Sequence, residues 1–415
     1  MDLTIEQSCP SCGAPIVLLE DDRLIRCASC DVNNYRLESG AARYVLPSKY
    51  PDHIAPAQLF FIPYLRFKGT IFYVHEGEIG HKIVDATRIG IEEEKLPATL
   101  GLRPQAMKLI PVVASVEGAF VGQTVATKAA FTQAAMVTEL FDGKSDKTLY
   151  HRAFIGETLS RIYQPCYLHE GIAYDAVVNK PLGSGRLLDR YQDKISPSKV
   201  SWEPQFISTI CPECSGLLAG ERDSLVLHCR NCESLWQENG KKFQPLSWQV
   251  VESDDRTAEY LPFWQITFST RGWVLQSFGD YLRFTNQPLV VAGRFDSIPL
   301  AFWIPAIKLN PKAFLQISSQ LTVSQWRIPS GSMRRLDNDH PVTLNQKEAV
   351  QAIKSVLAAT TLNKSKRLPL LPQMTIVDAR CQLIYLPFTK QPHDYVQEHT
   401  SAVLLAAALR FGRKL

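Results

Sequence analysis

Short apolar runs separated by turn-forming residues dominate this chain, and they predict more strand than helix. The stretches 58–87 and 258–293 are dense in Phe, Tyr, Ile and Val, which fit the pleated, half-buried surface of a sheet. Helical periodicity of apolar residues is clearest in three segments, 124–141, 346–360 and 397–411. This balance of strands and helices predicts the α+β class.

Eight of the ten cysteines repeat one spacing, a CxxC pair, fourteen residues and a second CxxC pair. The two sets differ by 202 positions at every cysteine: Cys9, Cys12, Cys27 and Cys30 in the first half, and Cys211, Cys214, Cys229 and Cys232 in the second. Two pairs of thiolates offered from two tight turns suit a tetrahedral metal ion. Agreement of four positions at one offset also indicates an internal duplication.

Between the first two CxxC pairs, two short apolar runs flank an acidic turn, and this order predicts a β-hairpin. The runs are residues 16–19 and 24–25, and the turn is Glu20, Asp21 and Asp22. So few apolar residues are present that each unit is expected to need its metal in order to fold.

These two modules resemble the zinc-ribbon family, which occurs in transcription factors, polymerase subunits and many unrelated bacterial proteins. The resemblance rests on the CxxC pairs, covers about 25 residues in each copy, and implies a fold but no partner. The segments FFIPYLRF and EYLPFWQITF also resemble a stretch of uncharacterised bacterial zinc-ribbon proteins, a family of unknown function. Taken by themselves, the residues of these segments are typical of a core strand with a bulge or an edge at the proline.

Weaker matches continue the duplication beyond the cysteines, with an offset that drifts as loop insertions would make it. The matched segments are 59–67 with 260–266, 104–109 with 305–309, and 167–178 with 374–386. Both members of the last match are predicted to form a strand pair.

These patterns divide the 415 residues into five parts. They are zinc ribbon 1 at 1–40, a β-rich α+β domain at 41–185, a linker at 186–205, zinc ribbon 2 at 206–242, and a second β-rich α+β domain with a C-terminal helix at 243–415.

Zinc is the expected metal, with one structural ion in each set of four cysteines, because the spacing is ribbon-like and zinc needs no redox tuning. Four cysteines complete the tetrahedron, so no position is left for water or substrate. His228 lies beside Cys229 and is interpreted as a bystander. Iron is the alternative metal, since a rubredoxin-like centre also takes four thiolates from two CxxC turns.

The charge balance argues against a strong nucleic-acid-binding face. The formal net charge is +4; residues 1–200 carry 22 Lys and Arg against 23 Asp and Glu, and residues 201–415 carry 23 against 18. A metal held by four thiolates is itself anionic, and the first hairpin adds Glu20, Asp21 and Asp22. A surface that follows a phosphate backbone needs clustered Lys and Arg, so nucleic-acid binding is a disfavoured alternative.

Metal binding needs reduced thiols, and the two remaining cysteines, Cys166 and Cys381, do not require an oxidising compartment, so a cytoplasmic location is predicted. The N-terminal sequence lacks a secretory signal, and the longest apolar run, 402–409, is shorter than the ~20 residues that span a bilayer. The largely apolar segment 397–411 is expected to pack on its own domain, with peripheral membrane contact as an alternative.

No motif assigns a catalytic or a cofactor-binding residue, because GxSxG, HExxH and GxxxxGK[ST] are all absent. The sequence therefore favours a non-catalytic adaptor or accessory subunit of a larger protein assembly, built on two structural zinc sites. Its partner is expected to be a protein, and its oligomeric state is open. The alternatives are a nucleic-acid-associated zinc-ribbon factor and a rubredoxin-like iron electron carrier.

Overall fold

The computed structural model has the mixed α+β fold that the sequence predicts. It describes residues 4–37, 41–112, 116–127, 147–184, 195–197, 205–288, 293–326, 328, 331–333 and 338–412. The chain forms two compact units: unit 1 is built from 1–68, 84–145 and 158–208, and unit 2 from 69–83, 146–157 and 209–415. Each unit therefore takes residues from both halves of the sequence.

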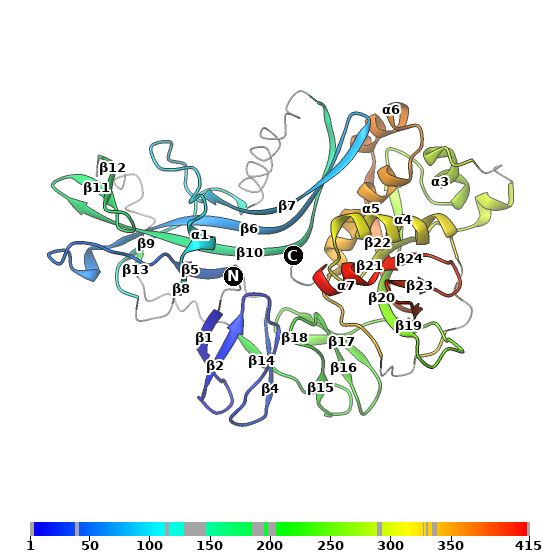
Figure 1. Ribbon diagram of the computed structural model, residues 1–415, viewed down its shortest axis with the longest axis horizontal. Coiled ribbons are helices and arrows are strands. Elements are labelled where there is room, and N and C mark those ends of the chain that lie inside the picture. The colour runs from blue at the N-terminus through cyan, green and yellow to red at the C-terminus, as the bar shows by residue number, and fades with distance from the viewer. Residues whose placement is uncertain are drawn as a thin grey trace. The chain divides into compact units, whose positions relative to one another are not determined.

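Unit 1 begins with the first cysteine module. β1 (Thr4–Ser8) pairs antiparallel with β2 (Pro15–Leu19), and β3 (Leu24–Arg26) pairs antiparallel with β4 (Asn33–Arg36). β14 (Phe206–Ser208) comes from the second half of the sequence and lies on the other side of β4 (Figure 1). The apolar side chains of this module share one buried cluster with the large sheet of unit 1.

Two long paired strands, β6 (Phe60–His75) and β10 (Leu149–His169), form the centre of the large sheet. The strand order is β12-β11-β10-β6-β9-β13, with β5 beside β10, β8 beside β5, and β7 beside β6. The remaining elements are β5 (Ala42–Val45), η1 (Pro56–Gln58), β7 (Glu78–Ile89), α1 (Arg103–Ala106), β8 (Ile110–Pro111), β9 (Ala119–Val121), β11 (Ile172–Asp175), β12 (Lys180–Ser184) and β13 (Ile195–Pro197).

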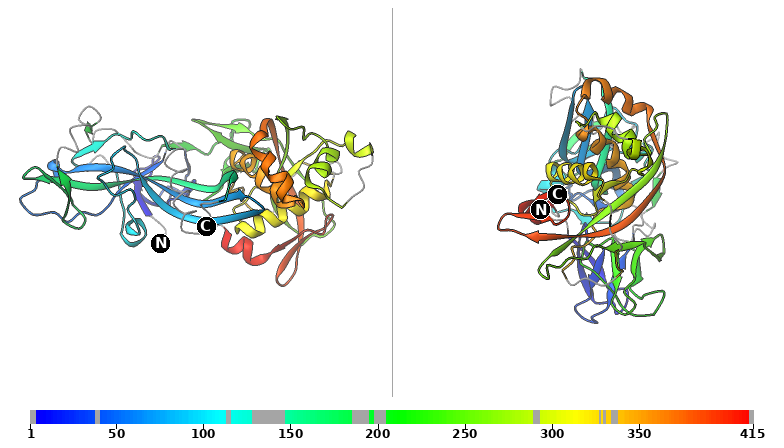
Figure 2. Two further views of the ribbon diagram at one scale, coloured as in Figure 1. Left: turned by 90° about the horizontal axis from the view of Figure 1, so that it is seen from above. Right: turned by 90° about the vertical axis from the view of Figure 1, so that its right-hand side faces the viewer.

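Unit 2 is built on a six-stranded sheet whose centre is the antiparallel pair of β20 (Glu259–Arg271) and β22 (Thr375–Lys390). The strand order is β21-β20-β22-β23-β24, and β19 runs parallel to β22. Helices α3, α4 and α5 pack on this sheet (Figure 2). The other bounds are β19 (Trp248–Val250), α3 (Phe278–Thr285), η3 (Gly293–Ser297), β21 (Phe302–Pro305), α4 (Pro311–Ser324), α5 (Gln346–Thr360), α6 (Lys364–Arg367), η4 (Leu368–Gln373), β23 (Asp394–Gln397), β24 (Val403–Leu405) and α7 (Ala406–Gly412).

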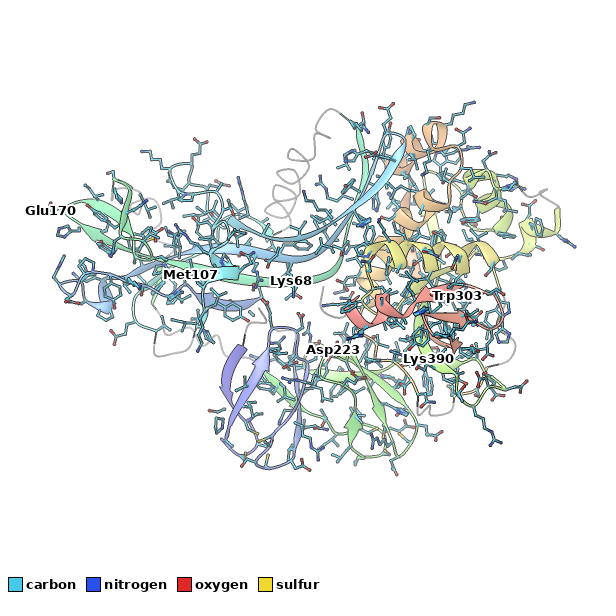
Figure 3. The ribbon with its side chains drawn as sticks, viewed as in Figure 1. Lys68, Met107, Glu170, Asp223, Trp303 and Lys390 are labelled. Atoms are coloured by element: carbon cyan, nitrogen blue, oxygen red, sulfur yellow. The ribbon has the colours of Figure 1, made fainter. Side chains whose placement is uncertain are left out.

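The second cysteine module belongs to unit 2 and forms a four-stranded sheet. Its strands are, in order across the sheet, β15 (Leu218–Ala219), β16 (Val226–Cys229), β17 (Leu235–Asn239) and β18 (Lys242–Pro245). Val226 and Leu235 are buried in the main core of unit 2, together with Trp264 and Trp303, the latter labelled in Figure 3. The module thus gains apolar contacts from the domain that follows it.

The two large sheets repeat one topology. β5 runs parallel to β10 in unit 1, and β19 runs parallel to β22 in the same place in unit 2. In both sheets the long strand is followed by two further strands, each antiparallel to the strand before it: β10-β11-β12 in unit 1 and β22-β23-β24 in unit 2. Tyr163 and Tyr385 occupy equivalent positions, since their carbonyls accept from the amides of Leu46 and Val251, both at 3.0 Å.

The proline–aromatic segments also match in structure. Gly90 N–H donates to the carbonyl of Pro63 (2.8 Å), and Ala306 N–H donates to the carbonyl of Pro262 (2.9 Å). The carbonyls of Gly90 and Ala306 each accept from two consecutive amides further along the chain. Repeated hydrogen bonds of this kind support the internal duplication independently of the cysteines.

Two of the weaker sequence matches are wrong. Residues 167–178 form the β10–β11 hairpin, as predicted, but 374–386 lie almost entirely within the single strand β22. The counterpart of the first hairpin is β22–β23, because Cys166 faces Asp175 and Phe388 faces Gln397 at the same relative positions. Residues 104–109 begin in α1, whereas 305–309 begin with the last residue of β21, so these segments differ in structure.

Of the three predicted helices, 346–360 is confirmed as α5, while most of 124–141 lies outside the described residues. The third, 397–411, is wrong over its first part. Gln397 ends β23, and its side-chain oxygen accepts from the amides of His399 and Thr400 (3.0 and 2.7 Å), which forms a turn instead of a helix. The apolar run then forms β24 before α7 begins at Ala406.

The strand-rich stretch 258–293 is confirmed only for β20 and contains helix α3 as well. Ser277 caps α3 in a capping box with Asp280, and this local signal outweighs the aromatic content. Helix α4 was not predicted; Asn310 caps it, with Pro311 in the first turn. Of the expected linker 186–205, only 195–197 and 205 are among the described residues.

Glu259, at the start of β20, joins a loop to the sheet of unit 2. His340 Nε2 and Lys390 Nζ each lie 2.9 Å from one of its carboxylate oxygens, and Lys390 is labelled in Figure 3. Partial burial raises the pKa of Glu259, but hydrogen bonds from Lys390, His340 and Tyr395 outweigh it and lower the pKa to about 2.

Glu259→Gln is expected to destabilise unit 2 by about 1 kcal/mol at neutral pH, because partly exposed ionic hydrogen bonds contribute about that much. The folded pKa lies below the ordinary value of 4.5. The contribution is therefore fully present above that value and is lost as the pH falls from there towards about 2. Chemical denaturation from neutral pH down to about 3 measures the difference, with Glu252→Gln at an exposed position as the control. A difference that stays constant on acidification would contradict this account.

Candidate metal centres

The structure brings the four sulfurs of each cysteine set together. Within each set all the sulfurs lie within 4.8 Å of one another, and all eight cysteines are free of disulfide bonds. Sulfur–sulfur distances are 3.9 Å for Cys9–Cys30, 3.7 Å for Cys12–Cys27, 3.7 Å for Cys211–Cys232 and 3.4 Å for Cys214–Cys229. Sulfurs at about 2.3 Å from a tetrahedral zinc ion would be about 3.8 Å apart, so each set could hold one metal ion.

The backbone repeats one tight turn at all four CxxC pairs. In the first turn of each module, Gly13 N–H donates to the carbonyl of Cys9 (2.8 Å) and Ser215 N–H donates to that of Cys211 (3.0 Å). The second turns are closed in the same way on the carbonyls of Cys27 and Cys229. The donor residue always has a positive φ, from 58° to 78°, at Gly13, Asp31, Ser215 and Glu233. Only the first of these four positions has the glycine that this conformation favours.

Hydrogen-bond donors stabilise selected thiolates. Burial raises the pKa of Cys9, but the amides of Ser11 and Cys12 and the neighbouring sulfurs outweigh it and lower the pKa to about 6. The side chain of Asn231 and the amide of Gly216 lower the pKa of Cys214 to about 6. Ser11, Gly216 and Asn231 each lie two residues beyond a cysteine, and the CxxC spacing alone does not identify them as donors.

Other sulfurs of the same sets resist ionisation. The Ser234 hydroxyl lowers the pKa of Cys232, but burial and the bonded sulfurs of Cys214 and Cys229 raise it to about 12. Neighbouring thiols therefore cannot all lose their protons together at neutral pH without a cation between them. A bound divalent metal would supply that charge and draw all four into the thiolate form.

The predicted hairpin between residues 16–19 and 24–25 is wrong, because β2 pairs with β1 and β3 pairs with β4 in a separate sheet. The acidic turn between β2 and β3 is not an exposed tip either, and this corrects the electrostatic argument drawn from the sequence. Glu20 and Asp22 are buried. A carboxylate oxygen of Glu20 lies 3.2 Å from Arg66, whose guanidinium also binds Asp85 at 2.6 and 2.7 Å. Burial raises the pKa of Glu20, although Arg66 acts against it. These contacts hold the first module on the large sheet of unit 1 instead of shaping its surface charge.

The remaining candidate residues lie outside the two sets. His228 is not among the clustered ligand atoms, and its ring packs edge-on to Trp248 at 6.3 Å. Cys166 is fully buried in unit 1 and Cys381 is half-buried in unit 2. In the described part of the chain, no third group of three or more His, Cys, Asp and Glu side chains has the geometry of a metal site.

Comparisons with protein-family models, with curated proteins and with solved structures found no match for this chain. Among the described residues, no helix combines the length and the apolar character needed to cross a bilayer.

Cys229→Ser is expected to abolish metal binding by the second set and to destabilise its module by several kcal/mol, because metal binding contributes to the folding free energy of such small units. Limited proteolysis with mass spectrometry should then show new cleavage between 209 and 245. Cys381→Ser, which changes a half-buried cysteine outside both sets, is the matched control. Unchanged protease resistance of Cys229→Ser would show that the module does not depend on its metal.

The positive-φ turns allow a paired test of backbone strain. Gly13→Ala is expected to weaken the first site by about 1 kcal/mol, since the new Cβ meets no atom within 4 Å and only the backbone conformation opposes it. Ser215→Gly, at the equivalent position of the second module, is expected to act in the opposite direction and by less, because glycine also gains entropy in the unfolded chain. Competition with a chelator measures both affinities. Equal effects of the same sign would refute the turn argument.

Proposed function

We propose that this chain is a non-catalytic adaptor or accessory subunit of a larger protein assembly, with one structural zinc ion in each cysteine set. The observation that carries the proposal is the closed donor set. Four sulfurs surround the space in which each ion would lie, which leaves no coordination position for water or substrate. A zinc ion held in this way stabilises a fold and takes no part in a reaction.

The buried contacts of both modules agree with a structural role. The first module shares a core with the large sheet of unit 1, and the second shares a core with unit 2. Each ion would therefore stabilise the junction between a small module and a larger domain. Zinc favours such sites because it has no redox chemistry and accepts a tetrahedral thiolate set without strain.

The two alternatives make different demands on the same residues. A rubredoxin-like carrier needs iron, which uses the same four-thiolate geometry. A nucleic-acid-associated factor needs unpaired cations beside the module, but Arg26 in the first module pairs with Asp31. The burial of Glu20 and Asp22 removes one argument against nucleic acid without supplying a basic surface in its place.

Metal analysis of the purified protein is expected to give two zinc ions per chain in a colourless sample, and native affinity purification is expected to recover a stoichiometric protein partner. Cys381→Ser should keep both ions, whereas Cys229→Ser should keep one. A coloured, iron-containing protein would support the electron carrier. Repeated recovery of the chain without any stoichiometric partner would contradict the adaptor.

A further inference from the structure

β14 is the second-half counterpart of β1, although it pairs with a different module. Residues 206–210 follow 4–8 by 202 positions, the offset that relates the two cysteine sets. In the first module, residues 4–8 pair with 15–19 over their whole length. In the second module only the end of this pairing is kept, as a bridge between Ile210 and Leu217 and a hydrogen bond between Thr209 and Leu218.

The rest of the strand has been diverted to the first module. Phe206, Ile207 and Ser208 pair antiparallel with residues 34–36 of β4, and Leu37 N–H donates to the carbonyl of Gln205 (2.8 Å). Figure 1 shows this green strand beside the blue β4. The diversion begins at Thr209, whose carbonyl still accepts from the amide of Leu218 in the second module (2.9 Å).

The diversion leaves an open edge on the second module. β15 is the terminal strand of its sheet, and within the described part of the chain the amide and carbonyl of Gly220 make no hydrogen bond. Leu217 is 71% exposed, and its bridge partner Ile210 is 50% exposed. The equivalent edge of the first module is covered by β1.

The open edge keeps the geometry of the covered one. Leu19 N–H donates to the Asp22 side chain (2.7 Å), and at the equivalent position Glu221 N–H donates to Ser224 Oγ (2.8 Å). Both turns also contain a backbone hydrogen bond of 3.1 Å, in which Asp22 N–H donates to the carbonyl of Leu19 and Ser224 N–H donates to that of Glu221. The edge formed by residues 219–221 is therefore shaped to accept the strand that precedes Thr209.

We propose that residues 206–208 have two alternative antiparallel partners, β4 in the first module and the open edge of β15 in the second. In the second pairing Ile207 would face Gly220, as Ile5 faces Leu18 in the first module. Residues 206–208 pair with three residues in either case, 34–36 of the first module or 219–221 of the second, so the number of backbone hydrogen bonds differs little. The half-buried contact of Phe206 with the unit 1 cluster favours β4.

An intact first module therefore holds the strand on β4, and its opening releases the strand to the second module. Since Thr209 and Ile210 already pair with 217–218, the change needs a backbone rotation only near Thr209. Whether the first cysteine set is intact therefore determines which strands pair in the sheet that carries the second set. A two-state element biased from one site is the physical requirement for such coupling.

Hydrogen exchange read by mass spectrometry tests the proposal. Cys27→Ser, which opens the first module, is expected to slow exchange in a peptide spanning 217–224 at least tenfold at one or two amides, because Gly220 acquires a strand partner. Adding Ile207→Pro should remove the new protection, since proline has no N–H to donate to Gly220. Protection of α5, which belongs to unit 2, confirms in each case that this unit is folded.

A second variant is designed to release residues 206–208 from β4 while leaving all cysteines unchanged. Leu37→Pro removes the donor to Gln205 and is expected to give the same new protection at 217–224. If α5 stays protected in both variants and the exchange of 217–224 does not slow, the strand does not change partner and the proposal is overturned. New protection that persists after Ile207→Pro would assign the edge to another occupant, such as a second copy of the chain, and would also overturn it.

Discussion

Sulfur–sulfur proximity is the constraint on which the rest of this structure depends. Four thiols held within 4.8 Å of one another cannot all ionise at neutral pH unless a cation lies between them. In the second set, burial and the sulfurs of Cys214 and Cys229 raise the pKa of Cys232, whereas hydrogen bonds from Asn231 and Gly216 lower the pKa of Cys214. The turns that bring the sulfurs together also include non-glycine residues at positive φ, such as Asp31 and Glu233. Both costs are offset if a metal ion is bound.

The modules contribute to folding beyond their own few residues. Ile16 and Leu18 are buried with the large sheet of unit 1, and Val226 and Leu235 are buried in the core of unit 2. Arg66 adds a buried ionic contact, because it binds both Glu20 of the first module and Asp85. A metal that orders the first module would therefore also order the part of the unit 1 core that this module forms.

The sequence predicts those features of the structure that depend on residues close together in the chain, and fails for those that depend on distant residues. The cysteine sets, helix α5 and the matched prolines Pro63 and Pro262 follow from short patterns, and all appear where expected. The sequence does not predict helix α3, although Ser277 and Asp280 form a capping box, because the surrounding aromatic residues favour a strand. The pairing of β14 with β4 joins residues about 170 positions apart, and no local pattern indicates which of two similar edges such a strand will choose. The burial of Glu20 also could not be predicted from neighbouring residues in the sequence, since it depends on Arg66 from a distant strand.

The duplication has not produced two independent modules. Residues 69–75 of β6 and 149–157 of β10 come from the first copy, yet they belong to unit 2, where Phe72 and Ile155 are buried in its main core. The corresponding far ends of β20 and β22 in the second copy are less buried: Arg271 and Arg380 are exposed, and Phe268 and Ile376 are only partly buried. One pair of strand ends has thus been used to join the copies within the chain, while its counterpart has lost that role. The same asymmetry affects β1 and β14, where equivalent strands complete different sheets. Because each copy contributes residues to a unit built mainly from the other, neither half is expected to fold alone.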